Sequence, residues 1–249
     1  MKKIPEVTLL FWVMKICATT LGETAGDLLS MTLHVGYGVS SLLLFSVFVV
    51  LLAGQLAASR YVPVLYWAVI LATSTAGTTL SDYLDRTLSL GYAAGAALLV
   101  TLLLATLGLW WRSEKSLAVK DIKTRTGELY YWVAILFSNT LGTALGDFLA
   151  DDSGLGFGGG ALLIGSLLAV VVLAHYFSRA SGVLLFWVAF VLTRPFGATF
   201  GDLLTKTPAK HGLGFGTTGS SLILFGILAG LVAYESWRPA AATSGRQGG

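Results

Sequence analysis

The stretch WVMKICATTLGETAGD, residues 12–27, carries the pattern that decides the fold. It opens on a tryptophan, ends fifteen residues later on an aspartate, and has a glycine five residues before that aspartate. The same pattern occurs four times along the chain. Its tryptophans are Trp12, Trp67, Trp132 and Trp187, its glycines are Gly22, Gly77, Gly142 and Gly197, and its aspartates are Asp27, Asp82, Asp147 and Asp202. The chain therefore consists of four tandem copies of one unit.

A second shared feature extends each unit past its aspartate. A glycine followed by an aromatic residue comes nine to twelve residues later, at Gly36-Tyr37, Gly91-Tyr92, Gly156-Phe157 and Gly214-Phe215. Each unit thus reads as a helix, a turn rich in glycine and aspartate, and a second helix that starts in close contact at the Gly-aromatic pair. The expected helices are residues 6–29, 37–58, 62–84, 92–111, 128–149, 158–177, 182–204 and 215–235.

Composition places these helices in a membrane. Of the 249 residues, 55% are hydrophobic and only 12% are charged, and the mean hydropathy is +0.78. A soluble domain has about 25% charged residues. The apolar runs meet the length of about 20 helical residues needed to cross a bilayer, and they lack the alternation of barrel strands. We predict an all-α integral membrane protein with eight transmembrane helices from four parallel two-helix repeats, arranged as two halves.

A polar segment separates the second repeat from the third. The predicted organisation is residues 1–111 for repeats 1 and 2, 112–127 for a cytoplasmic linker, 128–238 for repeats 3 and 4, and 239–249 for a disordered tail. The start, Met-Lys-Lys followed by apolar residues, resembles a signal peptide. It also matches the three later repeats position by position, so we interpret it as the first span.

Basic residues predict the orientation. Eight spans put both termini on one side, and eleven of the sixteen Lys and Arg residues fall there, against three on the other side. The positive-inside rule therefore predicts cytoplasmic termini and a multi-pass protein of the bacterial inner membrane. Because every repeat crosses twice, all four point the same way and are related by an axis along the membrane normal. A ring of this kind would bring the four first helices toward a common centre.

With these four units, the chain resembles a family of bacterial integral membrane proteins. Its members have four tandem repeats of unknown function, each with two transmembrane regions and a prominent tryptophan. The resemblance extends over about residues 6–237. It implies a fold and a location but no activity, so the function has to be argued from the residues.

Ionisable residues at membrane depth are the candidates for a functional site, because burying a charge in hydrocarbon is costly. The predicted ion-binding or substrate-binding residues are Lys15, Glu23, Asp27, Asp82, Asn139, Asp147, Arg194 and Asp202. Hard cations favour several carboxylate oxygens. The predicted metal ligands are therefore Glu23, Asp27, Asp82, Asp147 and Asp202. In a competing interpretation, each repeated aspartate caps the next helix or binds turn amides.

Departures from the repeat favour a specialised site. The residue seven positions after each tryptophan is Thr19, Ser74, Asn139 or Arg194. Glu23 corresponds to Thr78, Thr143 and Ala198 in the other repeats. We expect Arg194 to pair with Glu23 in the empty state, where a cation or a proton would compete for the carboxylate. Asp85 and Arg86, by contrast, read as a solvated pair at the outer surface.

These observations favour a transporter that moves a cation, with a divalent metal such as manganese as one candidate, coupled to protons or to the membrane potential. The alternative is a non-transporting scaffold, sensor or partner-binding subunit. A small-molecule or anionic substrate stays open, because Lys15 and Arg194 carry positive charge. No catalytic motif predicts an enzyme, no motif indicates a cofactor, and no basic stripe indicates nucleic acid. The expected partners are the lipid bilayer and the substrate, and the oligomeric state is open.

Overall fold

The computed structural model describes residues 3–237, and its regular elements there are all helical. The predicted disordered tail, residues 239–249, lies outside the described residues. The eight long helices are α1 (Leu9–Asp27), α2 (Tyr37–Ala57), α3 (Pro63–Asp82), α4 (Tyr92–Glu114), α5 (Arg125–Asp147), α6 (Gly156–Phe177), α7 (Gly182–Thr205) and α8 (Thr217–Trp237). The prediction of an all-α protein with eight long helices is confirmed.

Short helical turns lengthen three of the first helices. The π-helical turns are η1 (Leu28–Thr32), η2 (Tyr83–Thr87) and η4 (Phe148–Asp152), and each follows directly on the repeated aspartate. The helices therefore run three residues past the ends predicted for α1, α3 and α5. In the fourth repeat a loop replaces this turn and contains the 3-10 turn η5 (Pro208–Lys210). A further 3-10 turn, η3 (Val119–Asp121), lies in the linker.

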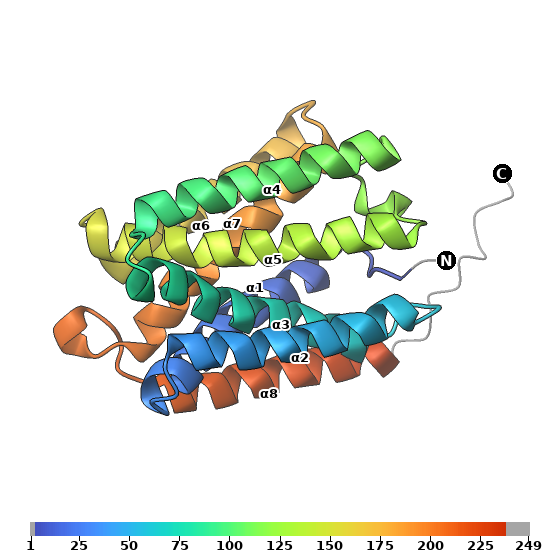
Figure 1. The fold of residues 1–249 in the computed structure, drawn as a ribbon. Helices are drawn as coiled ribbons and strands as arrows, with labels where there is room; N and C mark the ends of the chain where they lie inside the picture. The colour runs from blue at the N-terminus through green and yellow to red at the C-terminus, as the bar shows by residue number, and fades with distance from the viewer. Residues whose placement is uncertain (1–2, 238–249) are drawn as a thin grey trace, which may run out of the picture.

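The first helices of the four repeats form a closed ring. Helix α1 packs on α3, α3 on α5, α5 on α7, and α7 on α1 (Figure 1). The second helices lie outside this ring, with α2 on α3, α4 on α5, α6 on α7 and α8 on α1. Each second helix thus packs on the first helix of the following repeat. The linker that divides the sequence into halves leaves no break in the ring.

Glycines allow the ring helices to approach closely. The glycine of each repeat packs against the residue seven positions after the tryptophan of the next repeat. These contacts join Gly22 to Ser74, Gly77 to Asn139, Gly142 to Arg194 and Gly197 to Thr19. A Cβ atom on Gly197 would lie 2.6 Å from Thr19 Oγ1 and 2.8 Å from the Thr19 carbonyl carbon. Small residues have this role at helix contacts in membranes.

An aromatic layer fills one end of the ring. The residue before each repeated tryptophan is also aromatic, and its ring contacts the tryptophan of the next repeat. The centroid distances are 5.7 Å for Phe11–Trp67, 5.4 Å for Tyr66–Trp132, 6.4 Å for Tyr131–Trp187 and 5.8 Å for Phe186–Trp12. Tyr66 and Tyr131 also share a hydrogen bond of 2.6 Å between their hydroxyls. The tryptophans therefore hold the repeats together.

Seven of the described helices, α2 to α8, are long and apolar enough to cross a membrane. The buried share of the most apolar 18-residue window is 17–28% for each outer helix, α2, α4, α6 and α8. It is 44–72% for α3, α5 and α7. The outer helices therefore present apolar side chains to lipid. Helix α1, which carries Lys15, Glu23 and Asp27, completes the ring between α3 and α7. The chain is a multi-pass membrane protein.

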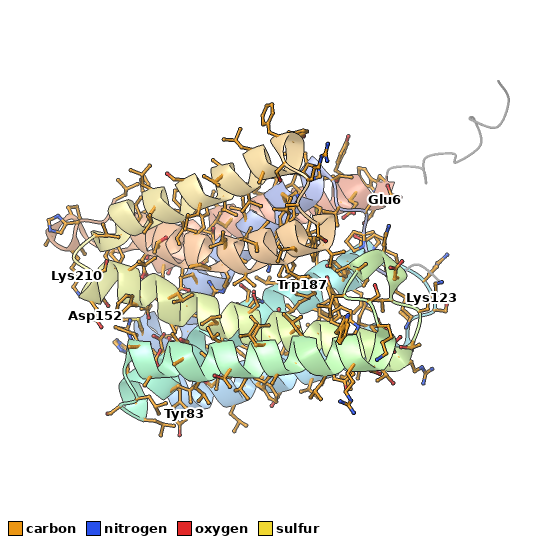
Figure 2. The ribbon with its side chains drawn as sticks, turned by 90° about the horizontal axis from the view of Figure 1, so that it is seen from above. Glu6, Tyr83, Lys123, Asp152, Trp187 and Lys210 are labelled. Carbon is orange, nitrogen blue, oxygen red and sulfur yellow. The ribbon has the colours of Figure 1, made fainter. Side chains whose placement is uncertain are left out.

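The two ends of the bundle differ in composition. Figure 2 labels Glu6 and Lys123 at one end, and Asp152 and Lys210 at the other. We call the first the terminal end, because α1 begins there and α8 ends there (Figure 1). The second is the aspartate end, where the ring helices finish at their repeated aspartates. The aromatic layer lies toward the terminal end, and the polar axis described below leads to the aspartate end.

Candidate functional site

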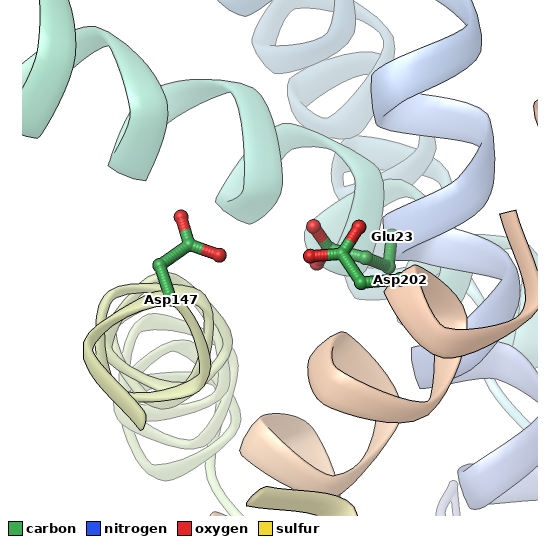
Figure 3. A group of neighbouring side chains, drawn as sticks. All are labelled: Glu23, Asp147 and Asp202. Carbon is green, nitrogen blue, oxygen red and sulfur yellow. The ribbon is translucent and has the colours of Figure 1, made fainter. Parts of the chain in front are cut away.

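Three carboxylates converge on the axis of the ring near its aspartate end. Glu23, Asp147 and Asp202 each offer one oxygen atom, and these three atoms lie within 4.8 Å of one another (Figure 3). All three residues are buried, and they come from α1, α5 and α7. Oxygen ligands lie about 2.0–2.6 Å from a hard divalent cation, so oxygens this far apart fit around one ion.

Each of these three carboxylates is paired with a different basic side chain. The pairs are Arg194 Nη1 with Glu23 Oε2 at 3.1 Å, Arg86 Nη2 with Asp147 Oδ2 at 3.1 Å, and Lys206 Nζ with Asp202 Oδ1 at 3.0 Å. Each carboxylate of the group therefore has a positive charge beside it. The predicted pairing of Arg194 with Glu23 is confirmed.

The other two repeated aspartates share the same basic side chains. Lys206 Nζ also lies 2.7 Å from Asp27 Oδ2, and Arg86 Nε lies 3.0 Å from Asp82 Oδ1. Lys206 thus bridges the fourth and first repeats. Burial works against its positive charge, but the Asp202 and Asp27 carboxylates outweigh burial and raise the pKa of Lys206 above its ordinary value.

Two of these contacts leave a carboxylate oxygen without a hydrogen bond. Asp82 Oδ1 and Asp202 Oδ1 lie within ion-pair distance of Arg86 and Lys206, yet neither oxygen accepts a hydrogen bond in the described structure. The attraction is therefore electrostatic without good donor alignment. A buried carboxylate oxygen of this kind keeps the capacity to bind a further ligand.

The capping interpretation of the aspartates is wrong for the first three repeats. Asp27, Asp82 and Asp147 directly precede π-helical turns, and none of their side chains makes a capping hydrogen bond there. Helices α2 and α4 begin instead after Gly36 and Gly91, whose φ angles of 80° and 74° favour glycine. No neighbouring side chain approaches these two glycines, so their backbone conformation, and not close contact, explains the Gly-aromatic pairs of the first two repeats.

Arg194 lies at the centre of the ring and contacts the other three repeats. Its side chain is fully buried, and besides Glu23 it donates hydrogen bonds to Thr78 Oγ1 and to Thr143 Oγ1, the latter at 2.7 Å. It also donates to the backbone carbonyls of Thr19 at 3.3 Å and of Ser74 at 3.2 Å. One side chain of the fourth repeat thus binds oxygen atoms of the first, second and third.

Lys15 and Asn139 form a separate polar layer, which lies closer to the aromatic layer and the terminal end. Lys15 Nζ donates to Asn139 Oδ1 at 3.2 Å and lies 4.0 Å from the centroid of the Phe190 ring. Asn139 Nδ2 in turn donates to Thr73 Oγ1 at 2.9 Å. Among the residues that the structure describes, no acidic side chain pairs with Lys15. These two predicted site residues therefore meet each other and not the carboxylates.

Comparison with known proteins places the chain in a family. The family model described as Repeat of Unknown Function (DUF347) matches it four times, over residues 10–61, 65–116, 130–181 and 185–240. The chain belongs to the DUF347 repeat family. Each match contains one tryptophan-to-aspartate unit, as the sequence pattern predicted. No curated protein and no solved structure matches the chain.

Two residues of the site were missed by sequence reasoning on this DUF347 protein. Arg86 and Lys206 stand four positions after Asp82 and Asp202, on the same helical face. The other repeats of this family member have Met31 and Asp151 at the equivalent position, so the repeat pattern gave no signal. A search for basic residues four positions after each aspartate would have found them.

The prediction that Asp85 and Arg86 form a solvated pair is also wrong. Asp85 is buried and accepts a hydrogen bond from Ser81 Oγ at 3.3 Å. Arg86 turns the other way, toward Asp82 and Asp147, and 34% of its side chain stays exposed. Lys206 is 20% exposed. These two basic side chains are therefore the exposed part of an otherwise buried charged site.

Proposed function

We propose that this protein is a transporter that moves a cation, with a divalent metal such as manganese as the first candidate. The observation that carries the proposal is the convergence of Glu23, Asp147 and Asp202, three buried carboxylates from three repeats, on the ring axis. Carboxylate oxygens are the ligands that such hard cations prefer. The buried Oδ1 atom of Asp202 accepts no hydrogen bond, so it offers a ligand atom once Lys206, which lies 3.0 Å away, is displaced.

The paired basic side chains suggest how the site is emptied and filled. A divalent cation brings two positive charges, so its binding displaces basic side chains from the carboxylates that they neutralise. Arg86 and Lys206 are suited to move aside, because both reach partly into solvent. Protons that bind the same carboxylates would release these side chains in the same way. Competition for one set of oxygens is the basis for coupling metal movement to protons or to the membrane potential.

Buried ion pairs by themselves contribute little net stability to a protein. Replacing a buried ion pair with apolar residues of similar volume is often neutral or stabilising, whereas removing one partner is strongly destabilising. Five carboxylates linked to three basic side chains in a small ring of helices therefore favour a functional origin. Because the sequence shows no Ser-His-Asp set, HExxH motif or paired intramembrane histidines, we propose transport ahead of an enzymatic activity.

The location that we propose is the bacterial inner membrane, with the terminal end in the cytoplasm. The support is the excess of Lys and Arg at that end. In this orientation, Arg86 and Lys206 face the non-cytoplasmic side, and the aromatic layer lies between the carboxylates and the cytoplasm. The site would then exchange ions with the outside in the conformation described here.

One observation favours the alternative of a partner-binding or sensor subunit. A cavity of about 1120 Å³ opens at the terminal end between the N-terminal segment, the linker and the start of α7. Lys120, Lys123 and Arg125 lie along it. A partner or ligand with negative charge would suit this cavity, and such a role needs no ion to cross the membrane.

Flux into proteoliposomes tests the proposal. The wild type is compared with Asp147→Asn, and Asp152→Asn serves as the matched control, because Asp152 is exposed and lies outside the site. We expect uptake of Mn²⁺ by the wild type and by Asp152→Asn, and its loss in Asp147→Asn with an unchanged elution profile. If no divalent or monovalent cation enters with the wild type, the partner-binding alternative is preferred.

A further inference from the structure

The guanidinium of Arg194 lies in a cage made only of oxygen atoms. The cage consists of Glu23 Oε2, Thr78 Oγ1, Thr143 Oγ1 and the backbone carbonyls of Thr19 and Ser74. All of these residues are buried, and Arg194 itself has no exposed surface. The cage contains one carboxylate and four neutral oxygens, so its net charge of −1 matches a single positive charge.

The repeat symmetry shows that the cage is a property of the ring and not of the arginine. Thr78 and Thr143 stand at the positions equivalent to Glu23, and the Thr19 and Ser74 carbonyls belong to the positions equivalent to Arg194. Repeats 1 to 3 thus direct equivalent side chains at one central point, and repeats 1 and 2 add equivalent carbonyls. In the fourth repeat, Ala198 replaces the oxygen-bearing side chain, and Arg194 supplies a cation instead.

The arginine does not satisfy its own hydrogen-bonding capacity in this place. Its Nε atom is buried and has no hydrogen-bond partner in the described structure. An unpaired buried donor of this kind costs about 1–3 kcal/mol, so the hydrogen bonds of the cage do not satisfy the arginine in full. The stem of the side chain reaches the centre over Gly142, where any Cβ atom would collide with it.

We propose that this oxygen cage is a second, inner cation site for a monovalent cation, and that Arg194 is its tethered occupant. A free monovalent cation takes the place of the guanidinium when the side chain withdraws. The inference rests on the proposed function, because Glu23 belongs both to this cage and to the three-carboxylate group. Occupation of the inner site would therefore control how much negative charge Glu23 offers to a divalent cation.

Chemical rescue tests the cage directly. Arg194→Ala is purified in detergent, and thermal unfolding is followed with millimolar guanidinium, sodium or potassium chloride, with choline chloride at equal ionic strength as the control. We expect Tm to fall by about 10 °C in Arg194→Ala, because Glu23 loses its counter-charge. Guanidinium should restore most of this loss in a saturable way, whereas choline, which is too large for the cage, should not.

Two further variants make the outcome specific. Adding Glu23→Gln to Arg194→Ala removes the carboxylate, and we expect the rescue by guanidinium to disappear. Adding Asp147→Asn instead leaves the cage intact, and we expect the rescue to remain. The proposal is overturned if guanidinium stabilises the double variant with Glu23→Gln as much as it stabilises Arg194→Ala. It is also overturned if no monovalent cation stabilises Arg194→Ala more than choline does.

Arg194→Gln serves if the alanine variant does not fold, because glutamine keeps most of the side-chain volume and removes the charge. A monovalent cation should then stabilise Arg194→Gln and have no effect on the wild type. Equal responses of the two would contradict the cage. Unfolding reports on the cage without any ion crossing a membrane, so a failure of metal flux in proteoliposomes leaves this result intact.

Discussion

The ammonium group of Lys206 lies 2.7 Å from the carboxylate of Asp27, although 179 positions separate the two residues in the chain. Because Lys206 also pairs with Asp202, it ties the fourth repeat to the first. Arg86 makes the equivalent bridge between Asp82 and Asp147, in the second and third repeats. These two basic side chains therefore join the four repeats two by two at the aspartate end of the ring.

Lys206→Gln leaves two buried aspartates without their shared counter-charge. We expect Tm in metal-free detergent to fall by about 5 °C. We expect millimolar Mn²⁺ to raise Tm more in the variant than in the wild type, because no tethered cation then competes for the carboxylates. Lys210→Gln, which changes an exposed lysine in the same loop, is the control. An equal response to Mn²⁺ in all three proteins would count against competition.

Gly197→Ala tests the close packing of the ring. The added methyl group would lie within 2.8 Å of three atoms of Thr19, so α7 and α1 must move apart. We expect a loss of about 1–3 kcal/mol in the free energy of unfolding. Gly226→Ala is the control, because no atom lies within 4 Å of a Cβ at that position on α8. Thermal unfolding that is similar in the two variants would contradict the packing described for the ring.

Glu23 and Arg194 are expected to depend on each other energetically. In a double-mutant cycle with Glu23→Gln and Arg194→Gln, the double variant should be more stable than the sum of the two single losses predicts. We expect a coupling of roughly 1–3 kcal/mol, because each single change leaves one buried partner unpaired. Asp152→Asn combined with Arg194→Gln should give additive losses, since Asp152 is exposed and remote from the cage. Unfolding in detergent measures both cycles.

Single-cysteine labelling tests the orientation. Cys17 is the only cysteine and is changed to alanine first. We expect Lys210→Cys to react with a membrane-impermeant thiol reagent on intact bacteria, and Lys123→Cys to react only after the cells are opened. The two positions lie at opposite ends of the bundle (Figure 2). The reverse labelling pattern would place the aspartate end in the cytoplasm.

The repeat made the fold predictable. The regular spacing of Trp12 and Asp27, found again in three further copies, indicated the number of helices and the common direction of the repeats. The ends of α1 and α3 were less well predicted. The residues after Asp27 and Asp82 continue as π-helical turns, in which a backbone N–H bonds the carbonyl five residues earlier. No proline or glycine within these turns marks the change in the sequence.

The carboxylates and Arg194 of the charged site were predictable from the sequence, but Arg86, Lys206 and most of the pairings were not. Arg194 and Glu23 stood out because they break the repeat, and they pair as expected. The contacts of Arg86 and Lys206 depend on how neighbouring ring helices are rotated about their axes. That rotation is set by the glycine contacts between repeats, and a single sequence does not specify which helix lies on which side.

The packing of each outer helix on the following repeat has a consequence for how the protein is made. Of the eight long helices described, α1 leaves the ribosome before the others, yet its outer cover is α8, which is synthesised after the other seven. The partners of its charged residues also come later in the chain: Lys15 binds Asn139 of α5, and Glu23 pairs with Arg194 of α7. Throughout insertion, a helix with three buried charged residues therefore has to be held in the membrane without the groups that later pair with them.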